Sequence, residues 1–352
     1  MLNTKKVLFC WSDFSGYMVS CWKELNKIDA IDLHVIAFGK SEETSFQKNM
    51  TSGLEINFID NPSAFDEVNA IVDSINPDYI VLCGWFVPAY KKLVAYKNLK
   101  ENTRFILAMD TPWWGKPRQK IAPYVLSAFL KKMDAVITSG ERSYQYAQRL
   151  GATKIFKIQY GVDASMLREA YNRRINSDWP TRFLFVGRFA KEKGLDVLVN
   201  GYRNYRDEIS NPWTLDACGQ GALEGLLEVE GITNHGFVQP ADMMKKWENA
   251  GCLVLTSTFD PWPLIVVEAC AAGLPVIVTH ASGSQVEVVK MFYNGLVIKE
   301  GITGELKEAM LWIHKHHKDL PEMGKRSLSQ AAPYDSNIWA KKFNFMIENL
   351  DL

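Results

Sequence analysis

Short apolar runs alternate with longer amphipathic stretches along most of the chain. In the first half, the apolar runs predict strands at residues 6–11, 33–38, 54–59, 79–83, 104–109, 135–138 and 155–159. The run Tyr79-Ile80-Val81-Leu82-Cys83 is apolar throughout, as expected of a strand buried on both faces of a parallel sheet. Helical periodicity over 19–25 and 65–74 predicts crossover helices, which parallel strands require.

The same alternation restarts after a polar stretch at 172–180, which reads as a linker. Strands are predicted beyond it at 183–186, 214–217, 232–237, 252–256 and 275–279. Helices are expected between them, for example over 195–205 and 241–250. Two βα arrays joined by a linker predict an α/β fold. We expect two Rossmann-like, doubly wound parallel-sheet domains, residues 1–170 and 180–333, which face a central cleft.

Composition and charge narrow the class of protein. The chain has 352 residues, of which 47% are hydrophobic and 23% charged, as in a soluble globular protein. Forty basic and forty acidic side chains cancel, which gives no support to nucleic-acid binding. The apolar runs are too short to span a membrane, and Met1–Lys6 leads directly into a strand without a signal-peptide pattern. Six scattered cysteines without metal-type spacing fit reduced thiols, so we expect a cytoplasmic protein.

Two acids separated by seven residues form the most informative motif. Asp260 begins the segment Asp-Pro-Trp-Pro-Leu-Ile-Val-Val-Glu, which ends at Glu268. Pro263 suits the first turn of a helix, so Asp260 is expected on a loop and Glu268 about a turn and a half inside the helix. Both acids can then face one site at the carboxyl end of a strand, where open α/β sheets bind ligands. The alternative is a solvated loop acid plus a helix acid that caps the helix.

A second motif places cations after a predicted strand. Gly187 and Arg188 follow the strand at 183–186, and Lys193 lies just before the next helix. Two cations near helix N-terminal N–H groups would suit a diphosphate. The alternative is a pair of surface cations, because Lys191 and Lys193 flank Glu192.

The first half offers weaker candidates. Gly16 lies in a turn after the first strand and would allow close approach of a phosphate. Asp110 follows the strand at 104–109 and is close to Trp113 and Trp114, a combination that suits a sugar because aromatic faces stack on C–H surfaces and carboxylates bind hydroxyls. The alternative is an apolar loop. The chain contains no Asp-x-Asp pair, which argues against a metal-chelating diphosphate site.

These residues together resemble the family-4 retaining glycosyltransferases of GT-B fold. Three blocks carry the resemblance: Val186-Gly187-Arg188 with Lys193-Gly194, the acid pair continuing through Ala-x-Gly-x-Pro-Val-Ile, and Asp134–Ser139 leading to Tyr160–Asp163. The resemblance implies a nucleotide-diphosphate sugar donor on the second domain and an acceptor on the first. It also implies that the final helix, expected at 335–352, packs back on the first domain.

The resemblance also implies roles for individual residues. Glu268 would hold the ribose hydroxyls, and Arg188 and Lys193 would bind the diphosphate with backbone groups at Gly16 and Gly187. The backbone N–H groups of Leu264 and Ile265 would bind the phosphates. Val238 would border the base, and Asp260 would contact the donor sugar. Trp113 and Trp114 would face the acceptor. Neither a cofactor nor a metal is implied.

The chain departs from the family pattern near the donor sugar. The first acid of the pair is usually Glu followed by Gly-Phe-Gly, whereas Asp260 precedes Pro-Trp-Pro. Asp110 stands where many members have His, and Ser15-Gly16 replaces a frequent Gly-Gly pair. The loop after Asp260 is therefore the place where donor-sugar choice is expected to be set.

We expect a metal-independent retaining transferase that builds a polysaccharide, another glycan or a lipid-linked glycan. The alternatives are a sugar-nucleotide epimerase of the same fold and a nucleotide-sugar-binding protein without turnover. A basic and apolar stretch at 116–132 predicts a helix that contacts a membrane surface, or, alternatively, a core-facing helix with basic ends.

Overall fold

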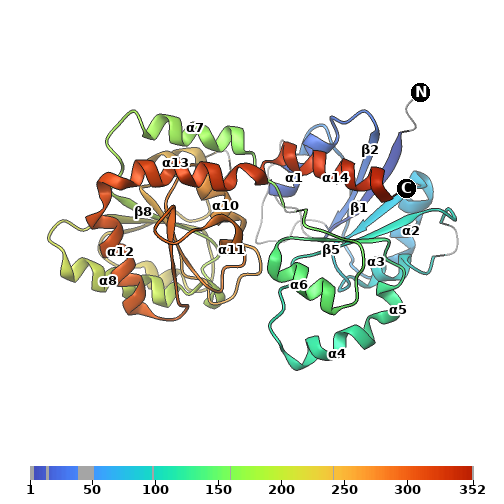
Figure 1. Cartoon of the computed structure of the whole chain (residues 1–352), viewed down its shortest axis with the longest axis horizontal. Coiled ribbons are helices and arrows are strands. Elements are labelled where there is room, and N and C mark those ends of the chain that lie inside the picture. The colour runs from blue at the N-terminus through green and yellow to red at the C-terminus, as the bar shows by residue number, and fades with distance from the viewer. Residues whose placement is uncertain are drawn as a thin grey trace. The chain divides into compact units, whose positions relative to one another are not determined.

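The computed structural model describes residues 4–12, 16–38, 51–96, 99–158, 160–240 and 242–350. The chain forms two compact units (Figure 1). The first unit comprises Met1–Gly161 and Ser336–Leu352, and the second comprises Val162–Asp335. Each is an α/β unit built on one parallel sheet, as the alternating pattern predicts.

The first unit contains a seven-stranded parallel sheet with the order β3-β2-β1-β4-β5-β6-β7. Its strands are β1 (Lys5–Cys10), β2 (Ile31–Phe38), β3 (Glu55–Ile59), β4 (Tyr79–Leu82), β5 (Arg104–Met109), β6 (Ala135–Thr138) and β7 (Ile155–Phe156). The direction of strand addition reverses between β1 and β4, which creates the point at which ligands bind in open α/β sheets.

The first unit has seven α-helices among the described residues. They are α1 (Gly16–Leu25), α2 (Phe65–Ile75), α3 (Pro88–Leu93), α4 (Pro117–Val125), α5 (Ser127–Leu130), α6 (Glu141–Arg149) and α14 (Ser336–Leu350). All but α4 contribute buried apolar side chains to the cores on the two faces of the sheet. One apolar core joins the sheet to α1 and α14 through side chains such as Trp22, Trp339 and Phe343. The other core joins it to α2, α3, α5 and α6. The strands are therefore buried on both sides, which explains their continuous apolar runs.

The second unit contains a six-stranded parallel sheet with the order β10-β9-β8-β11-β12-β13. Its strands are β8 (Arg182–Val186), β9 (Thr214–Cys218), β10 (Ile232–Asn234), β11 (Cys252–Leu255), β12 (Val276–Thr279) and β13 (Gly295–Ile298). Its α-helices are α7 (Ala164–Arg174), α8 (Leu195–Glu208), α9 (Met243–Asn249), α10 (Leu264–Ala271), α11 (Gln285–Val288), α12 (Thr303–Lys315) and α13 (Leu320–Ala331). The direction of strand addition reverses between β8 and β11.

The boundary between the units differs from the sequence prediction. The first domain was expected to end at residue 170 and a linker to follow at 172–180. Instead, residues 162–170 belong to the second unit, because α7 buries Leu167, Ala170 and Tyr171 and packs on α9, α10 and α13. The chain passes back into the first unit at Ser336, where α14 begins.

Two edge strands are shorter than predicted. β7 covers Ile155–Phe156, and β10 ends at Asn234 rather than at residue 237. Each has a single neighbour in its sheet, so fewer hydrogen bonds extend it. Gly236 has a φ of 63°, in the left-handed region, and this turns the chain out of the strand direction.

In the described part of the chain, no helix combines the length and apolar character needed to cross a bilayer.

Candidate functional site

The acid pair and the cations of the second unit lie on two neighbouring loops. Arg188 and Lys193 follow β8, whereas Asp260 and Glu268 follow β11. β8 and β11 are adjacent strands, and the strand order reverses between them. The two motifs predicted from sequence therefore meet at the reversal point, at the carboxyl ends of the strands, where this fold class places its ligands.

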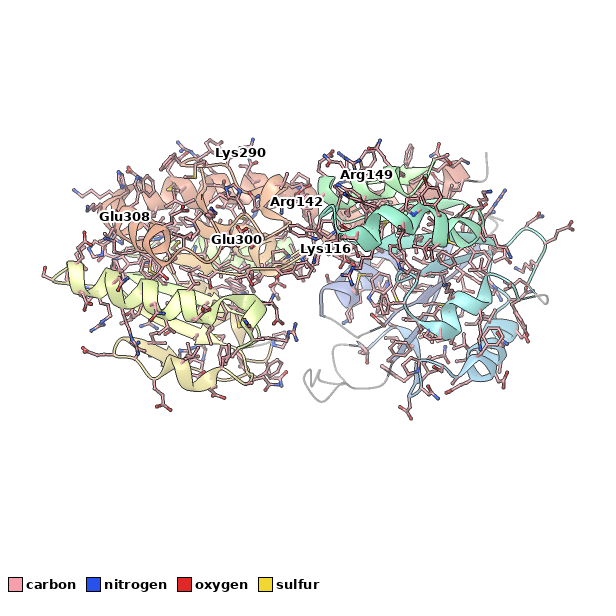
Figure 2. The ribbon with its side chains drawn as sticks, turned by 90° about the horizontal axis from the view of Figure 1, so that it is seen from below. Lys116, Arg142, Arg149, Lys290, Glu300 and Glu308 are labelled. Atoms are coloured by element: carbon pink, nitrogen blue, oxygen red, sulfur yellow. The ribbon has the colours of Figure 1, made fainter. Side chains whose placement is uncertain are left out.

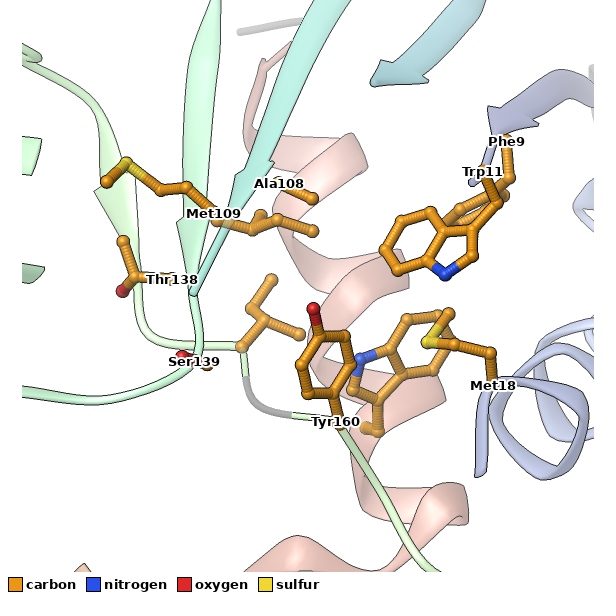
Figure 3. A pocket seen from close by; sticks show the side chains of 11 residues that line it. Phe9, Trp11, Met18, Ala108, Met109, Thr138, Ser139 and Tyr160 are labelled. Carbon is orange, nitrogen blue, oxygen red and sulfur yellow. The ribbon is translucent and has the colours of Figure 1, made fainter. Parts of the chain in front are cut away.

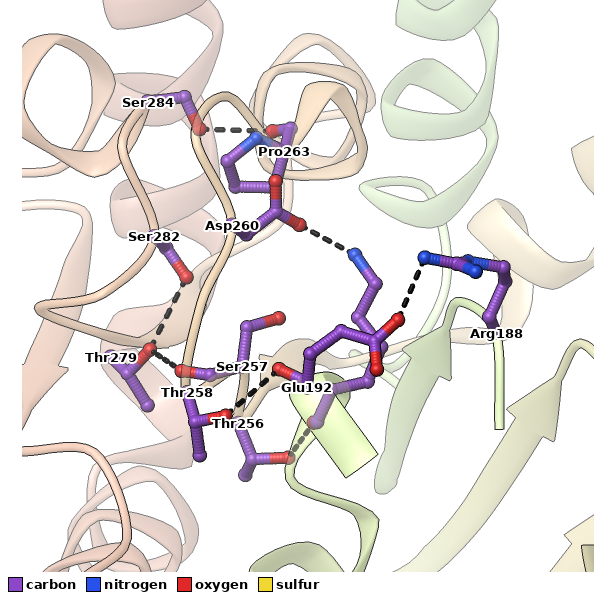
Figure 4. Close-up of polar contacts among 11 residues, drawn as sticks. Arg188, Glu192, Thr256, Ser257, Thr258, Asp260, Pro263, Thr279, Ser282 and Ser284 are labelled. Carbon is purple, nitrogen blue, oxygen red and sulfur yellow. Dashed lines mark hydrogen bonds and ion pairs between the residues drawn. The ribbon is translucent and has the colours of Figure 1, made fainter. Parts of the chain in front are cut away.

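Lys193 and Asp260 form a direct ion pair. The distance between Lys193 Nζ and Asp260 Oδ2 is 2.5 Å, and the two side chains are largely buried (Figure 4). A charge-assisted hydrogen bond in a low-dielectric setting fixes both groups in position. The ammonium and the carboxylate are thus held in one place, so a ligand that contacts either group is in reach of both.

A tight turn holds Lys193 in place. Gly194, directly after Lys193, has a φ of 63°, and a Cβ atom at this position would lie 2.1 Å from the carbonyl oxygen of Thr256. The hydroxyl of Thr256 donates a hydrogen bond of 3.0 Å to the carbonyl oxygen of Lys193. Only glycine fits both the backbone angle and the close approach. The β8 loop is therefore locked onto the end of β11.

Arg188 pairs with Glu192 four residues later, at 2.7 Å. Both side chains are substantially exposed, in contrast to Lys193 and Asp260. The carbonyl oxygen of Glu192 accepts a hydrogen bond of 2.8 Å from the N–H of Thr258 (Figure 4 labels both residues). The side chain of Arg188 is thus partly accessible to solvent, whereas that of Lys193 is largely buried.

The carboxyl group of Glu268 lies on α10 without a hydrogen bond or ion pair among the described residues. The side chain retains some exposure, but it is densely surrounded by protein, and this burial raises the pKa of Glu268 to about 7. Burial of a carboxyl group without a partner is unfavourable, so hydroxyl groups of a ligand that donate hydrogen bonds to it would be favoured. The helix places it in the second turn, as the spacing from Asp260 predicts.

The first turn of α10 supplies backbone donors. Pro263 is the residue just before the helix, rather than a member of its first turn as predicted, and Leu264 and Ile265 are the first two helical residues. The first N–H groups of a helix have no intrahelical acceptor and carry a partial positive charge. An anion can therefore be bound at this end of α10.

The Pro-Trp-Pro loop after Asp260 is rigid. Ser284 Oγ donates a hydrogen bond of 2.9 Å to the carbonyl oxygen of Pro263, and the N–H of Gly283 donates one of 2.9 Å to the carbonyl oxygen of Asp260. Trp262 is buried and packs against Tyr334 with a centroid distance of 6.3 Å. The loop that departs from the family pattern is therefore fixed from both sides.

The remaining donor-side candidates lie on neighbouring turns. The N–H of Gly187 donates to the carbonyl oxygen of Cys218, which ties the β8 loop to the β9 loop at 3.0 Å. Gly219 permits close packing there, because a Cβ atom would lie 1.9 Å from the carbonyl oxygen of Gly187. Val238 is half-buried and follows β10, so it too comes after the carboxyl end of a strand of this sheet.

The first-unit candidates lie at the ends of β1 and β5. Gly16 is the first residue of α1, and the turn before it at residues 13–15 lies outside the described residues. Asp110 directly follows β5. Trp113 packs on Tyr146 at 5.7 Å and under the guanidinium of Arg149 at 4.7 Å. Trp113 is thus mainly a packing residue, whereas Trp114 is 37% exposed.

A small pocket opens at the carboxyl ends of β1, β5 and β6 in the first unit (Figure 3). Aromatic and apolar side chains dominate its lining, among them Trp11, Met18, Tyr160 and Trp339. Its interior volume of about 10 Å³ admits roughly one water molecule. The pocket does not hold a sugar in this form.

Sequence reasoning missed Arg174, a buried cation that supports α10. One guanidinium nitrogen donates to the carbonyl oxygens of Ala272 and Gly273, at 3.1 Å each, and another donates to that of Trp247. Burial lowers the pKa of Arg174 to about 9. Arg174 thus binds the carboxyl ends of α9 and α10, and no sequence signal separates it from the exposed Arg173 beside it.

The histidines at 314, 316 and 317 each have a separate partner. His314 Nδ1 lies 2.7 Å from the hydroxyl of Tyr205, His316 stacks on Trp312 at 4.0 Å, and His317 Nε2 lies 2.8 Å from a backbone oxygen. They pack against aromatic side chains of the second unit rather than face one another.

Comparison with known proteins agrees with this arrangement. Residues 168–329, which include both motifs, match the family model described as glycosyl transferases group 1. The match lies within the second unit, and the fold of the chain is the GT-B fold of glycosyltransferases.

Two relatives are similar over parts of their length. A 41.2 kDa uncharacterized protein in the cps region of Klebsiella pneumoniae is 25% identical over 61% of this chain and 61% of its own length. The N,N'-diacetylbacillosaminyl-diphospho-undecaprenol alpha-1,3-N-acetylgalactosaminyltransferase of Campylobacter jejuni is 28% identical over 44% of this chain and 36% of its own. The chain thus spans less than two thirds of either relative.

Solved structures match over almost the full chain. A glycosyltransferase from Rickettsia africae has a TM-score of 0.77 with 14% identity, covering 99% of both chains. Anabaena Alr3699/HepE in complex with UDP and glucose has a TM-score of 0.73 with 15% identity, covering 98% of this chain and 100% of its own. At these identities the likeness establishes the fold.

Proposed function

We propose that the chain transfers a sugar from a nucleotide-diphosphate sugar to a glycan or lipid-linked glycan, with retention of configuration and without a metal. The observation that carries the proposal is the meeting of Lys193, Asp260 and the N-terminus of α10 at the strand-order reversal of the second unit. The matched glycosyltransferase domain includes all of these residues. The relatives from a cps region and from undecaprenol-linked glycan assembly support a role in polysaccharide or glycoconjugate biosynthesis.

The proposed donor site divides into three parts. Glu268 accepts hydrogen bonds from the ribose hydroxyls, which supply the donors that its carboxyl group lacks. Arg188, Lys193 and the N–H groups of Leu264 and Ile265 bind the diphosphate. The turns at Gly187 and Gly16 add backbone contacts, and Val238 borders the base.

In the proposed reaction, the bond between the anomeric carbon of the sugar and the diphosphate oxygen breaks, and a bond to an acceptor oxygen forms on the same face. The acceptor proton leaves to a phosphate oxygen of the departing nucleoside diphosphate. Negative charge grows on that leaving group, so fixed cations beside it stabilise the transition state more than the ground state. Arg188 and Lys193 would have this role.

Asp260 would contact hydroxyls of the donor sugar while it holds Lys193. Because its loop is fixed by Ser284 and Gly283, a one-carbon change in the acid would shift the carboxylate relative to the sugar. In the first unit, Asp110 and Trp114 would face the acceptor, with Trp113 as support. A cytoplasmic location is part of the same proposal.

The first experiment identifies the donor by measuring the melting temperature of the protein with different nucleotide sugars. A panel of UDP-glucose, UDP-N-acetylglucosamine, UDP-galactose and GDP-mannose is expected to contain at least one donor that raises the melting temperature, because a ligand that binds only the native state stabilises it by mass action. No stabilisation by any nucleotide sugar or by UDP and GDP would contradict the proposal.

Arg188→Ala and Lys193→Ala are each expected to reduce transfer from the identified donor by about a hundredfold or more, the scale for one charge-stabilising group. The measurement is nucleoside diphosphate release in the presence of a lipid-linked or oligosaccharide acceptor. Lys191→Ala is the matched control, since Lys191 is exposed on the same turn. Melting curves of Lys193→Ala and of the double variant Lys193→Ala/Asp260→Asn show whether an unpaired buried acid destabilises the single variant, which separates misfolding from lost catalysis. Wild-type rates in both single variants would refute the assignment.

A further inference from the structure

Helix α4 buries a glutamine and exposes three apolar side chains. Gln119 is its one buried residue. In contrast, Ile121, Tyr124 and Val125 are 58%, 84% and 73% exposed. These three positions share a helix face, because they are spaced three and four residues apart. A helix whose apolar face packed on the core would show the opposite pattern, so the core-facing alternative does not hold for α4. It does hold later in the same stretch, where Leu126 and Phe129 are buried in the core of the first unit.

The hydrogen bonds of Gln119 explain the orientation of α4. Its amide oxygen accepts hydrogen bonds from the N–H groups of Trp114 and Lys116, at 2.8 and 3.3 Å, and its amide nitrogen donates to the carbonyl oxygen of Pro112 at 2.8 Å. The buried side of the helix is thus tied to the loop that precedes it. The apolar side is largely exposed, and the helix lies at the periphery of the first unit, away from the sheet (Figure 1).

The same segment is strongly basic. Five exposed cations and no carboxylate occur between Thr111 and Met133, namely Lys116, Arg118, Lys120, Lys131 and Lys132. The whole chain has a net charge of zero, so this concentration is a local property. Arg142 and Arg149 of α6 lie near the same loop, since both contact Trp113, and Figure 2 shows them close to Lys116.

We propose that the exposed side chains of residues 116–132 bind the anionic face of a phospholipid bilayer. Apolar side chains flanked by lysine and arginine are what an interfacial helix requires: the former enter the boundary between headgroups and acyl chains, and the latter contact lipid phosphates. A second copy of the chain is a poorer partner, because a symmetric contact would oppose five cations to five cations. A nucleic acid would use the cations but leave Ile121 and Val125 exposed.

The proposal is tested by sedimentation of the full chain with vesicles of phosphatidylcholine, with or without phosphatidylglycerol, and without any nucleotide sugar. We expect binding to the anionic vesicles that weakens as salt is raised. Arg118→Gln with Lys120→Gln should lower the partition coefficient by roughly 25-fold, about fivefold for each cation. Ile121→Ser/Tyr124→Ser/Val125→Ser should lower it at least about tenfold, since the buried apolar area is lost.

Two variants serve as matched controls. Phe345→Ser removes an aromatic ring that is 62% exposed on α14, and Lys325→Gln removes an exposed cation on α13. Both should bind anionic vesicles as the wild type does. All variants change exposed side chains, so their melting curves should match that of the wild type, which excludes misfolding as a cause.

Three outcomes would overturn the proposal. They are absence of wild-type binding to the phosphatidylglycerol vesicles, equal binding by the wild type and both surface variants, and a stable dimer in sedimentation velocity that the triple serine variant abolishes. Because no donor or acceptor is present, these results are separate from success or failure of the transferase assay.

Discussion

At the scale of single residues, the carboxyl group of Glu268 has different proton affinities in the folded and unfolded chain. Burial raises its pKa from 4.5 to about 7. An acid with a raised pKa in the folded state adds to stability only while it is protonated, so this contribution is complete below about pH 4.5 and is lost as the pH rises through 7. The native state therefore bears an unfavourable charge above pH 7 until a ligand supplies hydrogen-bond donors.

Glu268→Gln should consequently stabilise the protein at pH 8 by about 3 kcal/mol relative to wild type and change little at pH 5. The free energy of unfolding from urea titrations at the two pH values measures this. A difference between variant and wild type that is the same at pH 5 and pH 8 would show that burial of the charge is not the cause. The variant should also bind the donor more weakly, because it loses the charged acceptor.

Arg174 and Arg173 are adjacent arginines in different settings. Arg174→Met should lower the free energy of unfolding by about 3 kcal/mol or more, because it leaves buried carbonyl oxygens at the ends of α9 and α10 without donors. Arg173→Met removes an exposed ion pair with Glu248 and should cost less than about 1 kcal/mol. Chemical denaturation of the two variants gives the comparison, and equal costs would contradict the supporting role of Arg174.

Sequence reasoning found the residues of the donor-side motifs but not their contacts. Lys193 and Asp260 were each selected from local context, yet their ion pair joins positions 67 residues apart, and a single sequence carries no record of such pairing. The raised pKa of Glu268 likewise depends on burial that the fold produces. The roles assigned to the site residues stay predictions.

At the scale of secondary-structure elements, strands were easier to predict than helix orientation. β5 and β6 begin and end where their apolar runs do, because both faces of the sheet are covered. The periodicity of α4 located an apolar face, but periodicity does not say whether that face meets the core or solvent. The buried glutamine decides this, and its burial is visible only in three dimensions.

Two glycines with the same φ angle, Gly194 in the turn between β8 and α8 and Gly236 after β10, give a matched prediction. Gly194 and Gly236 both have a φ of 63°, but only at Gly194 would a Cβ atom collide with backbone, while nothing lies within 4 Å at Gly236. Gly194→Ala should destabilise the protein by at least about 2 kcal/mol, and Gly236→Ala by about 1 kcal/mol, the cost of the left-handed angle. Thermal denaturation compares them, and similar losses would mean that the close approach to Thr256 is unimportant.

At the scale of the whole molecule, the last helix completes the core of the first unit. Trp339 and Phe343 of α14 stack at 5.3 Å and both contact Phe9 of β1, at 6.2 and 5.2 Å. Residues more than 300 positions apart thus share one hydrophobic cluster. The core of the first unit is thus built from α14 as well as from β1 and α1.

Trp339→Ala should therefore cost about 3–5 kcal/mol, as expected when a large aromatic side chain is removed from a packed interior. Phe345→Ala changes an exposed ring on the same helix and should stay within about 0.5 kcal/mol of wild type. Urea unfolding followed by tryptophan fluorescence, with circular dichroism as a second probe for the tryptophan variant, distinguishes the two. A tolerated Trp339→Ala would mean that α14 contributes little to the first unit.

The two places where the chain passes between the units are neighbours. A Cβ atom on Gly161 would lie 2.7 Å from the Cα atom of Ser336, and the N–H of Val162 donates a hydrogen bond of 2.9 Å to the carbonyl oxygen of Tyr334. The second unit is thus an insertion in the sequence of the first unit, and the chain enters and leaves it at adjacent positions. For protein engineering, this means that residues 162–335 can be exchanged as one piece: a homologous second unit can be grafted between Gly161 and Ser336, which lie next to each other.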